Sequence, residues 1–470
     1  MEKTIMLPPI IFKEGQALYD QLYTHIRDEI TSGSIPPGSK LPSIRKLSTQ
    51  LNISKTTVEH AYGQLLAEGY TVSREKSGIY VEKIDTSFFR GIQHEDDAGS
   101  PIAPPDTGVK YDFHYSRINH DSFPLKDFER AQKWAFSQFE HFQYGDHFGY
   151  APLRRMLSVY LRNTRGVQSN PEQIIIGSGT RYLISLLVHL LDLTTEEVGY
   201  ENPGFDGVRE YLKWAGVPIA PIQVDEDGIS LEKLTHINPK VVYTTPAHQF
   251  PTGAIMPIKR RVELLQWANE QSAYIFEDDF DGEFRYSGRP IPSLQSLDKQ
   301  ERVIYLGSFS KALTPALRIS FMVLPPHLLK RLQRNERSIG QTSSTIMQAA
   351  LYHFINEGFW HRHLNRVRNE YVKRYYLLHT ELQRGFPENS KVIATDAGFH
   401  MLLKLPGMNE DQIVDHALKR GVKVYPTAAY WEGNEKAPRD TILLGFGGLN
   451  ERDLSAGIAI LRDVVKELKA

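Results

Sequence analysis

Short apolar runs alternate with longer helical patterns through residues 110–470, and this alternation restricts the fold more than any other feature of the sequence. Four of the runs lie at 173–176, 240–243, 273–276 and 303–306. The pattern predicts an α/β domain with a mostly parallel sheet that is covered by helices. Ligands of open α/β sheets bind beyond the carboxyl ends of the strands, so the residues after each run are the candidate site.

The residues after the run at 303–306 place one lysine, Lys311, close to Ser308, Ser310 and Arg318. At the end of a buried strand, desolvation and nearby cations lower the pKa of a lysine and make its amine nucleophilic toward an aldehyde. The two hydroxyls and the guanidinium are then placed to hold a phosphate. The alternative interpretation is a surface loop with an ordinary lysine.

Other candidate residues also follow apolar runs. Gly179 and Thr180 precede a predicted helix, whose first N–H groups can bind a phosphate. Phe205 is predicted on a turn, where its ring could stack on a heteroaromatic ring. Asp278 and Asp279 end a buried run, and a buried carboxylate needs a cationic partner such as a protonated pyridine nitrogen. The alternative for this pair is a helix cap or a metal site.

Residues 13–83 have the pattern of a separate small domain. Apolar residues at helical spacing predict three helices, the third capped by Ser54, and residues 70–82 read as two strands around a turn. This order is typical of a helix-turn-helix with a wing. The segment from 40 to 58 contains four basic residues and no acidic one, which indicates a DNA-binding face. The alternative is a small helical cap with solvated charges.

The sequence of this domain resembles the winged helix of the GntR family in two segments, L-P-S-I-R-K-L-S at 41–48 and T-V-E-H-A-Y-G-Q-L-L-A-E-G at 57–69. The start of the third helix also suits phosphate and base-edge contacts in a major groove of double-stranded DNA. The candidate DNA-contacting residues are Ser43, Arg45, Lys55, Thr56, Thr57 and Arg74.

A linker is predicted at 84–109, where the periodic apolar pattern stops and prolines accumulate. Such a flexible tether lets two domains move relative to each other.

The motifs of residues 110–470, taken in order, resemble the aminotransferase-like domain of the MocR/GabR regulators. They are G-S-G-T, E-N-P-G-F, T-P-A-H-Q-F-P-T-G, E-D-D-F-D and G-S-F-S-K-A-L followed by an arginine. The resemblance implies a homodimer of fold type I with a smaller C-terminal α+β subdomain, which binds pyridoxal 5'-phosphate (PLP) as an internal aldimine on Lys311. It implies Asp278 on the pyridine nitrogen, although Asp279 stays an alternative. The other implied cofactor residues are Gly179, Thr180, Arg181, Phe205, His248, Ser308, Ser310 and Arg318, with Tyr144 or Tyr150 reaching the phosphate from the partner subunit.

Two positions depart from the family pattern. Phe280 stands where relatives have a tyrosine that bonds the cofactor's phenolate oxygen, so that bond is missing or comes from His248 or Gln249. Residues 445–449 read G-F-G-G-L where amino-acid-binding relatives carry the arginine that grips a carboxylate. This loss argues against transamination and against an amino acid effector, unless another arginine substitutes; the candidates are Arg181, Arg209 and Arg439.

The sequence therefore predicts a transcriptional regulator that uses PLP as its effector and controls vitamin B6 synthesis genes. One alternative is a sensor of an amino acid, and another is a working aminotransferase fused to a DNA-binding domain. A third is a plain DNA-binding protein whose second domain only dimerises.

Composition and charge restrict the kinds of site and of cellular location that this protein can have. The formal charge of −1 on 470 residues confines nucleic-acid binding to one segment. The absence of cysteine excludes disulfides and thiolate zinc sites and fits a reducing compartment. No apolar run approaches the roughly 20 residues of a membrane span, so we expect a cytoplasmic protein. His361 and His363 are two apart on a predicted helix and make a poor metal pair, and we expect no metal.

Overall fold

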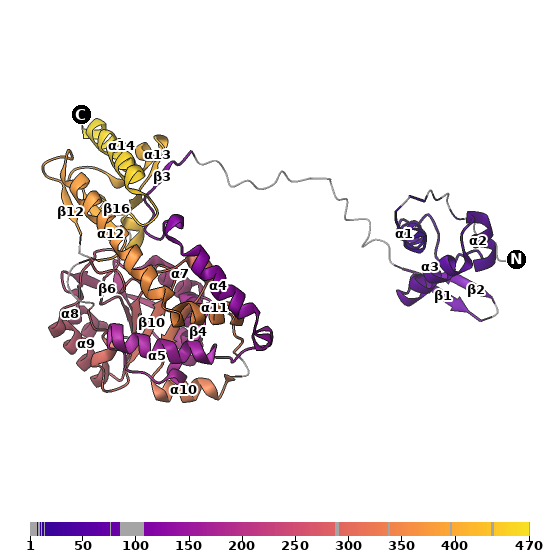
Figure 1. The fold of residues 1–470 in the computed structure, drawn as a ribbon, viewed down its shortest axis with the longest axis horizontal. Helices are drawn as coiled ribbons and strands as arrows, with labels where there is room; N and C mark the ends of the chain where they lie inside the picture. Colours follow the sequence, from indigo (N-terminus) through magenta and orange to yellow (C-terminus); the bar gives the residue numbers. More distant parts are fainter. Residues whose placement is uncertain are drawn as a thin grey trace. The chain divides into compact units, whose positions relative to one another are not determined.

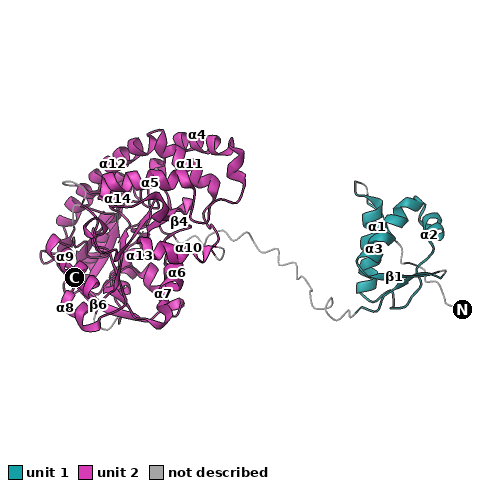
Figure 2. Cartoon of the chain, turned by 90° about the horizontal axis from the view of Figure 1, so that it is seen from below, with its two compact units in different colours: residues 1–105 teal, residues 106–470 magenta. Residues whose placement is uncertain are grey.

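The computed structural model describes residues 7, 10, 12–13, 15–75, 77–84, 108–286, 291–336, 339–394, 397–433 and 437–469. The chain divides into two compact units, Met1–Pro105 and Asp106–Ala470, each with its own hydrophobic core (Figure 2). The predicted linker lies almost entirely outside the described residues. Among the helices of the described ranges, none combines the length and apolar character that a membrane crossing requires.

The smaller unit contains three helices and a two-stranded antiparallel hairpin (Figure 1). Their bounds are α1 Leu18–Thr31, α2 Ile44–Leu51, α3 Lys55–Ala67, β1 Thr71–Arg74 and β2 Gly78–Val81. Ser54 caps α3 as predicted, since its Oγ accepts a hydrogen bond from the Thr57 N–H at 3.0 Å. Asn52 ends α2 at a φ of 52°, a left-handed conformation that asparagine adopts more readily than most residues. The helix-turn-helix and its wing are thus both present.

The larger unit is organised around an eight-stranded sheet in the order β4-β11-β10-β9-β8-β5-β6-β7. The strands are β4 Ile174–Gly177, β5 Val198–Asn202, β6 Ile219–Asp225, β7 Gly228–Ile229, β8 Val241–Thr244, β9 Tyr274–Asp279, β10 Val303–Ser308 and β11 Ser320–Val323. Strands β6, β5, β8, β9 and β10 pair in parallel, whereas β11 is antiparallel to both of its neighbours and β7 is antiparallel to β6. The predicted mostly parallel sheet is confirmed, and the four apolar runs are four of its strands.

Successive side chains of each strand point to opposite faces of the sheet. Apolar side chains occur on both faces here, so helices cover both. Val241 and Tyr243 pack on one face, and Val242 packs on the other. The first face is covered by α6 Thr180–Leu190, α7 Asp206–Trp214 and α10 Pro326–Gln333. On the second face lie α8 Leu231–Ile237, α9 Ile258–Glu270, α5 Ala151–Arg165, α11 Thr345–Asn356 and α12 Phe359–Gln383.

The C-terminal part forms the smaller subdomain that the sequence predicted. Its antiparallel sheet has the order β12-β13-β16-β15 and packs with two helices. The bounds are β12 Lys391–Ile393, β13 His400–Lys404, β15 Tyr425–Pro426, β16 Thr441–Gly445, α13 Glu410–Lys419 and α14 Glu451–Lys469. The short strand β3 Tyr111–Asp112 pairs with β14 Val422–Lys423, so the start of the larger unit is tied to this subdomain.

Candidate functional site

A cavity of about 440 Å³ lies beyond the carboxyl ends of the parallel strands in the large sheet. The residues of the predicted cofactor site that line it are Gly179, Thr180, Arg181, Phe205, Asp278, Ser308, Ser310, Lys311 and Arg318. They come from the ends of β9 and β10, the start of α6, the turn before α7 and the segment before β11. Segments far apart in the sequence therefore meet at one cavity, as the pattern of polar residues after apolar runs predicts.

Lys311 presents its amine to this cavity from the turn after β10. Its Nζ donates a hydrogen bond to the backbone carbonyl of Tyr115 at 2.8 Å and lies 4.8 Å from the centre of the Tyr115 ring. Burial lowers the pKa of Lys311 to about 7, although the nearby Asp281 carboxylate opposes the shift. A large share of the amine is therefore uncharged and nucleophilic near neutral pH.

Asp278 and Asp279, the last two residues of β9, point to different surroundings. Asp278 lines the cavity and accepts a hydrogen bond from the Tyr243 hydroxyl. Burial raises its pKa to about 7. It makes no ion pair within the described part of the chain, so a ligand cation could stabilise its charged form.

Asp279 already has a cationic partner. Its Oδ2 accepts from Arg165 Nε at 2.6 Å and from the Tyr305 hydroxyl at 2.5 Å. Asp279 does not line the 440 Å³ cavity. Of the two carboxylates, Asp278 is therefore the one that faces the cavity, and its role as the pyridine-nitrogen partner stays a prediction.

Glycine, hydroxyl and arginine groups meet at the other end of the cavity. Gly179 has a φ of 115°, and a Cβ there would lie 2.3 Å from Arg318 Nη2, so only glycine allows the guanidinium this close. Arg318 Nη2 donates to the Ser178 carbonyl at 2.9 Å. Ser308 and Ser310 are hydrogen-bonded to each other, with a distance of 2.9 Å between their Oγ atoms. Together with the first N–H groups of α6, these donors form a cradle for a phosphate.

Three residues of the predicted cofactor set lie outside this cavity: Tyr144, Tyr150 and His248. His248 is buried, and its Nδ1 is 2.7 Å from Asp281 Oδ2. The Tyr150 hydroxyl lies 3.1 Å from His141 Nε2. Tyr144 is fully exposed on the surface of its own chain, and its predicted contact concerns a partner subunit. Phe280 lines the cavity at the position of the missing tyrosine. Gln249, the other candidate to replace that hydroxyl, uses its amide on the Pro203 and Phe250 carbonyls.

The position of the missing arginine is filled by another segment. A Cβ at Gly448 would lie 2.6 Å from Arg117 Cβ, and a Cβ at Gly447 would lie 2.6 Å from the Arg117 carbonyl oxygen. Arg117 in turn pairs with Asp112 at 2.9 Å. Arg117 therefore occupies the space that a side chain at Gly447 or Gly448 would need.

The three candidate substitutes for this arginine have different surroundings. Arg209 donates to the Tyr430 and Ala429 carbonyls and is fully engaged there. Arg439 pairs with carboxylates of α13. Arg181 alone of the three lines the cavity, where its Nε donates to the Gly207 carbonyl at 3.1 Å.

Four aromatic and hydroxyl residues of the cavity wall were not predicted: Tyr115, Ser116, Phe250 and Ser320. The rings of Tyr115 and Phe250 lie 4.7 Å apart. Tyr115 follows the two-residue strand β3, which gives no recognisable apolar run. Phe250 belongs to the motif T-P-A-H-Q-F-P-T-G, so the sequence did contain a pattern from which it could have been predicted as a cavity residue.

The candidate DNA-contacting residues lie in and around the helix-turn-helix and on the wing. Arg45, Lys55 and Thr56 are exposed at the first turns of α2 and α3. The hydroxyls of Ser43 and Thr57 take part in the caps of these two helices. On the wing, Arg74 lies over the Tyr80 ring with its guanidinium carbon 4.4 Å from the ring centre, and the arginine remains exposed.

The two histidines of α12 occupy different environments, as their spacing predicts. His361 is exposed, whereas His363 is buried and its Nε2 is 2.7 Å from the Ala312 carbonyl oxygen. Within the described residues, no group of three or more histidine and carboxylate side chains could hold a metal ion.

Two family models match the chain. Residues 118–434 match class I and II aminotransferases, and residues 18–81 match the bacterial regulatory proteins of the gntR family.

Full-length relatives combine the same two parts. The chain is 40% identical over 451 residues to the uncharacterised HTH-type transcriptional regulator YdeL of Bacillus subtilis, covering 95% of this chain and 96% of YdeL. It is 32% identical to the probable rhizopine catabolism regulatory protein MocR of Rhizobium meliloti, covering 96% of this chain and 94% of MocR. It is 31% identical to the pyridoxine biosynthesis regulator PdxR of Corynebacterium glutamicum, covering 96% and 97% of the two chains.

Among solved structures, the kynurenine aminotransferase of Pyrococcus horikoshii superposes with a TM-score of 0.69 and 26% identity. The match covers 77% of this chain and 91% of the enzyme.

Proposed function

This chain belongs to the MocR-type regulators, in which a gntR-family winged helix precedes a class I and II aminotransferase domain, and we propose that it binds PLP at Lys311 and uses the cofactor as its signal. Membership of this family makes the chain a transcriptional regulator. The proposal adds that PLP is its ligand, that Lys311 is the attachment point and that PLP acts as the signal. One observation carries it: the 440 Å³ cavity joins an amine of lowered pKa, a buried carboxyl group without a cationic partner in the described residues, and a cradle of phosphate donors.

The residues present fit PLP at three points. Lys311 supplies the amine that attaches to its aldehyde. Asp278 supplies a buried carboxylate for a protonated pyridine nitrogen, which would remove the cost of burying that charge alone. Gly179, Ser308 and Arg318 line the end of the cavity where the phosphate would lie. When bound, PLP would supply an electron sink and a visible absorbance that reports its attachment.

The cofactor itself is the proposed effector because the carboxylate clamp of amino-acid-binding relatives is missing. Gly448 replaces the arginine, and Arg117 fills the space beside it. The relative PdxR is described as a regulator of pyridoxine biosynthesis, which supports vitamin B6 synthesis genes as the target. Occupancy can change DNA binding only if PLP binds one arrangement of the protein better than another.

A second candidate function is a sensor of an amino acid. Arg181 favours it, because its guanidinium lines the cavity and makes only one hydrogen bond, to the Gly207 carbonyl, within the described residues. An external amino acid would then bind through its carboxylate to Arg181.

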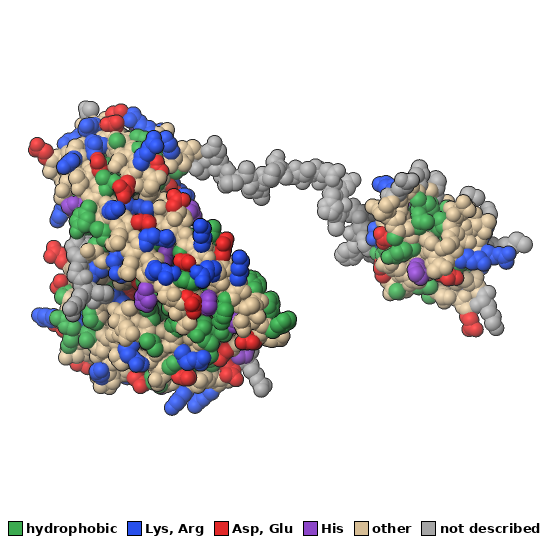
Figure 3. Space-filling model, in the orientation of Figure 1, with side chains coloured by type: hydrophobic (Ala, Val, Ile, Leu, Met, Phe, Trp, Pro, Cys, Tyr) green, Lys and Arg blue, Asp and Glu red, His purple; other side chains and the backbone are tan. Residues whose placement is uncertain are grey.

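A homodimer is part of the same proposal. Four aromatic residues close in sequence are exposed, namely Phe136, Phe139, Phe142 and Tyr144, and Phe139 as a whole residue is 89% exposed. Figure 3 shows hydrophobic side chains gathered at the edge of the larger unit beside α4 Leu125–Phe136. An apolar patch of this kind is typical of a surface that a partner covers. A second copy would also bring Tyr144 near a neighbouring cavity.

Absorbance titration tests cofactor binding. Wild-type protein should gain a visible band on addition of PLP, and Lys311→Ala should lose it while keeping its fold. Lys330→Ala, an exposed lysine of α10, is the matched control and should behave as wild type. An unchanged band in Lys311→Ala would contradict the proposed attachment point.

A further inference from the structure

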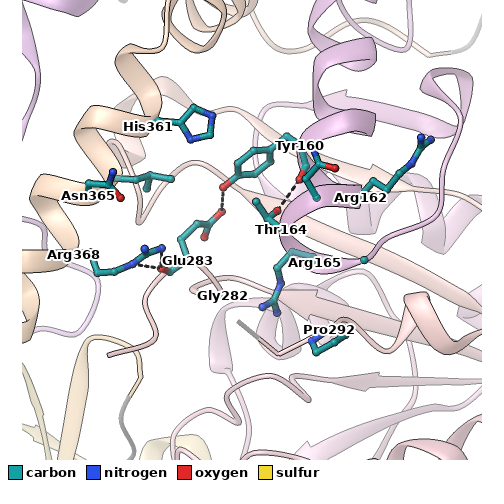
Figure 4. A pocket seen from close by; sticks show the side chains of 13 residues that line it. Tyr160, Arg162, Thr164, Arg165, Gly282, Glu283, Pro292, His361, Asn365 and Arg368 are labelled. Atoms are coloured by element: carbon teal, nitrogen blue, oxygen red, sulfur yellow. Dashed lines mark hydrogen bonds between the residues drawn. The ribbon is translucent and has the colours of Figure 1, made fainter. Parts of the chain in front are cut away.

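A second cavity, of about 540 Å³, lies away from the proposed cofactor site and shares none of its lining residues. Its walls are the last turns of α5, the segment after β9 and the first half of α12 (Figure 4). Most of the lining residues are of polar or charged types, among them Tyr160, Arg165, Glu283, His361 and Arg368. Nothing in the proposed function uses this cavity.

Arg165 is the central group of this wall. Its side chain is only 6% exposed, and Nε pairs with Asp279. Its Nη2 finds no hydrogen-bond partner in the described part of the chain, and neither does Asp279 Oδ1. The pair with Asp279 raises the pKa of Arg165, so the guanidinium stays charged. A buried charged N–H without an acceptor is costly. Nη2 itself is enclosed in this structure, so an acceptor in the adjoining cavity would remove that cost once the Arg165 side chain turns toward it.

Arg368 approaches from the opposite wall. Its Nε and Nη2 donate to the Glu283 carbonyl at 3.2 and 2.9 Å, which fixes the guanidinium across the cavity and leaves Nη1 for a ligand (Figure 4). Arg162 adds a third guanidinium at the rim and makes no side-chain hydrogen bond within the described residues. Arg165 and Arg368 are thus the two guanidinium groups on facing walls, whereas the Arg162 side chain points outward from the rim (Figure 4).

Glu283 is the one acidic residue among the described residues that line this cavity. The Tyr160 hydroxyl donates to its carboxylate at 3.4 Å. Burial raises the pKa of Glu283 to about 7, so its negative charge is partly lost near neutral pH. Asp279 already balances the charge of Arg165, so the excess of positive charge in this cavity comes from Arg368 and Arg162. The Glu283 carboxylate is placed to accept from a hydroxyl or amine of a ligand.

We propose that this cavity binds a small molecule that carries an oxyanion, a phosphate or a carboxylate, with the anionic oxygens on Arg165 and Arg368. Guanidinium groups bind both oxyanions through paired N–H donors, and the volume lies within the roughly 300–1,000 Å³ of small-molecule sites. The proposal does not depend on PLP binding in the other cavity.

Isothermal titration of the full chain with inorganic phosphate, and separately with succinate, tests it. Inorganic phosphate also fits the cradle around Arg318, so wild type is compared with Arg318→Gln. Binding that persists in Arg318→Gln and weakens at least tenfold in Arg368→Gln would support the second site. The oxyanion that binds more tightly shows whether the natural ligand carries a phosphate or a carboxylate.

Two further variants separate binding from folding. Arg162→Gln removes an exposed rim charge that supports no described contact, and it should weaken binding several-fold with an unchanged melting temperature. Arg155→Gln, on the exposed face of α5 and outside the cavity, should bind as wild type. Three results would overturn the proposal: no binding by wild type at millimolar concentrations, binding abolished by Arg318→Gln, or full binding by both Arg368→Gln and Arg162→Gln.

Discussion

Lys311 and Asp278 face the same cavity, and burial shifts the pKa of both groups to about 7 in opposite directions. An amine of lowered pKa reacts with an aldehyde, and a carboxylate that lacks a cation favours a cationic ligand. Neither group is stabilised in its charged form by an ion pair within the described chain. The proposed attachment of PLP depends on these two residues.

The pH dependence of PLP attachment follows from Lys311. Only the uncharged amine reacts, and its share rises as the pH passes through the pKa. With a pKa of about 7, the rate should rise about tenfold between pH 6 and pH 8 and then level off, whereas an unshifted lysine would give about a hundredfold rise without levelling. Stopped-flow absorbance measures this rate. A steady tenfold rise per pH unit would show that the amine is not desolvated.

Asp278 and Asp279 should differ in the effect of replacement. Asp278→Asn should keep the fold and lower PLP affinity at least tenfold, since it removes the carboxylate that faces the cavity. Asp279→Asn should leave Arg165 buried with its charge unpaired, which costs about 3–5 kcal/mol of unfolding free energy. Denaturant unfolding and absorbance titration measure the two effects. The assignment is wrong if Asp279→Asn folds normally and loses PLP while Asp278→Asn retains it.

The main cavity residues could be predicted because each follows an apolar strand or a glycine turn. Tyr115 could not, because its place depends on the pairing of β3 with β14, two short strands far apart in the sequence. The Arg165–Asp279 pair was also missed, since nothing local to either residue indicates its partner. Tertiary contacts of this kind leave no periodic signal in a sequence.

At the scale of elements, the parallel strands and the caps of the helix-turn-helix determine where functional groups lie. Buried strands of four to six residues gave clear apolar runs, so β4, β8, β9 and β10 were found. The two-residue strands β3, β7, β14 and β15 were not, because two residues cannot show a pattern. Ser43 and Ser54 hold α2 and α3 at their first turns, where Arg45 and Lys55 are exposed.

Loss of one basic residue from these turns should weaken DNA binding through the phosphates. Arg45→Ala should lower affinity for all sequences and reduce the slope of log affinity against log salt by about 0.9. Fluorescence anisotropy over a salt series measures both quantities. Arg27→Ala on α1, whose guanidinium pairs with Asp28, serves as the control and should keep the wild-type slope. Equal effects of the two substitutions would contradict the assignment of the DNA-binding face.

At the scale of the whole molecule, the chain joins two independently packed units, one that matches the gntR family and one that matches class I and II aminotransferases. The larger unit exposes an aromatic patch beside α4 that the described part of its own chain does not cover. A dimer would cover this patch and provide two winged helices for two half-sites of DNA.

Phe139→Asp should therefore shift the protein from dimer to monomer, because it introduces a charge into the proposed interface. Light scattering coupled to size-exclusion chromatography measures the mass directly. Trp214→Asp replaces an aromatic that is similarly exposed on α7, and it should leave the mass unchanged. A dimer that persists in Phe139→Asp would place the interface on another surface.

The most direct test of PLP as the signal is the affinity of the full chain for DNA from its own upstream region, with and without PLP and with no amino acid present. The expected result is a change of at least fivefold in wild type on addition of PLP and no change in Lys311→Ala. The account would be contradicted if PLP bound to Lys311 without altering DNA affinity, and if an added amino acid altered it instead.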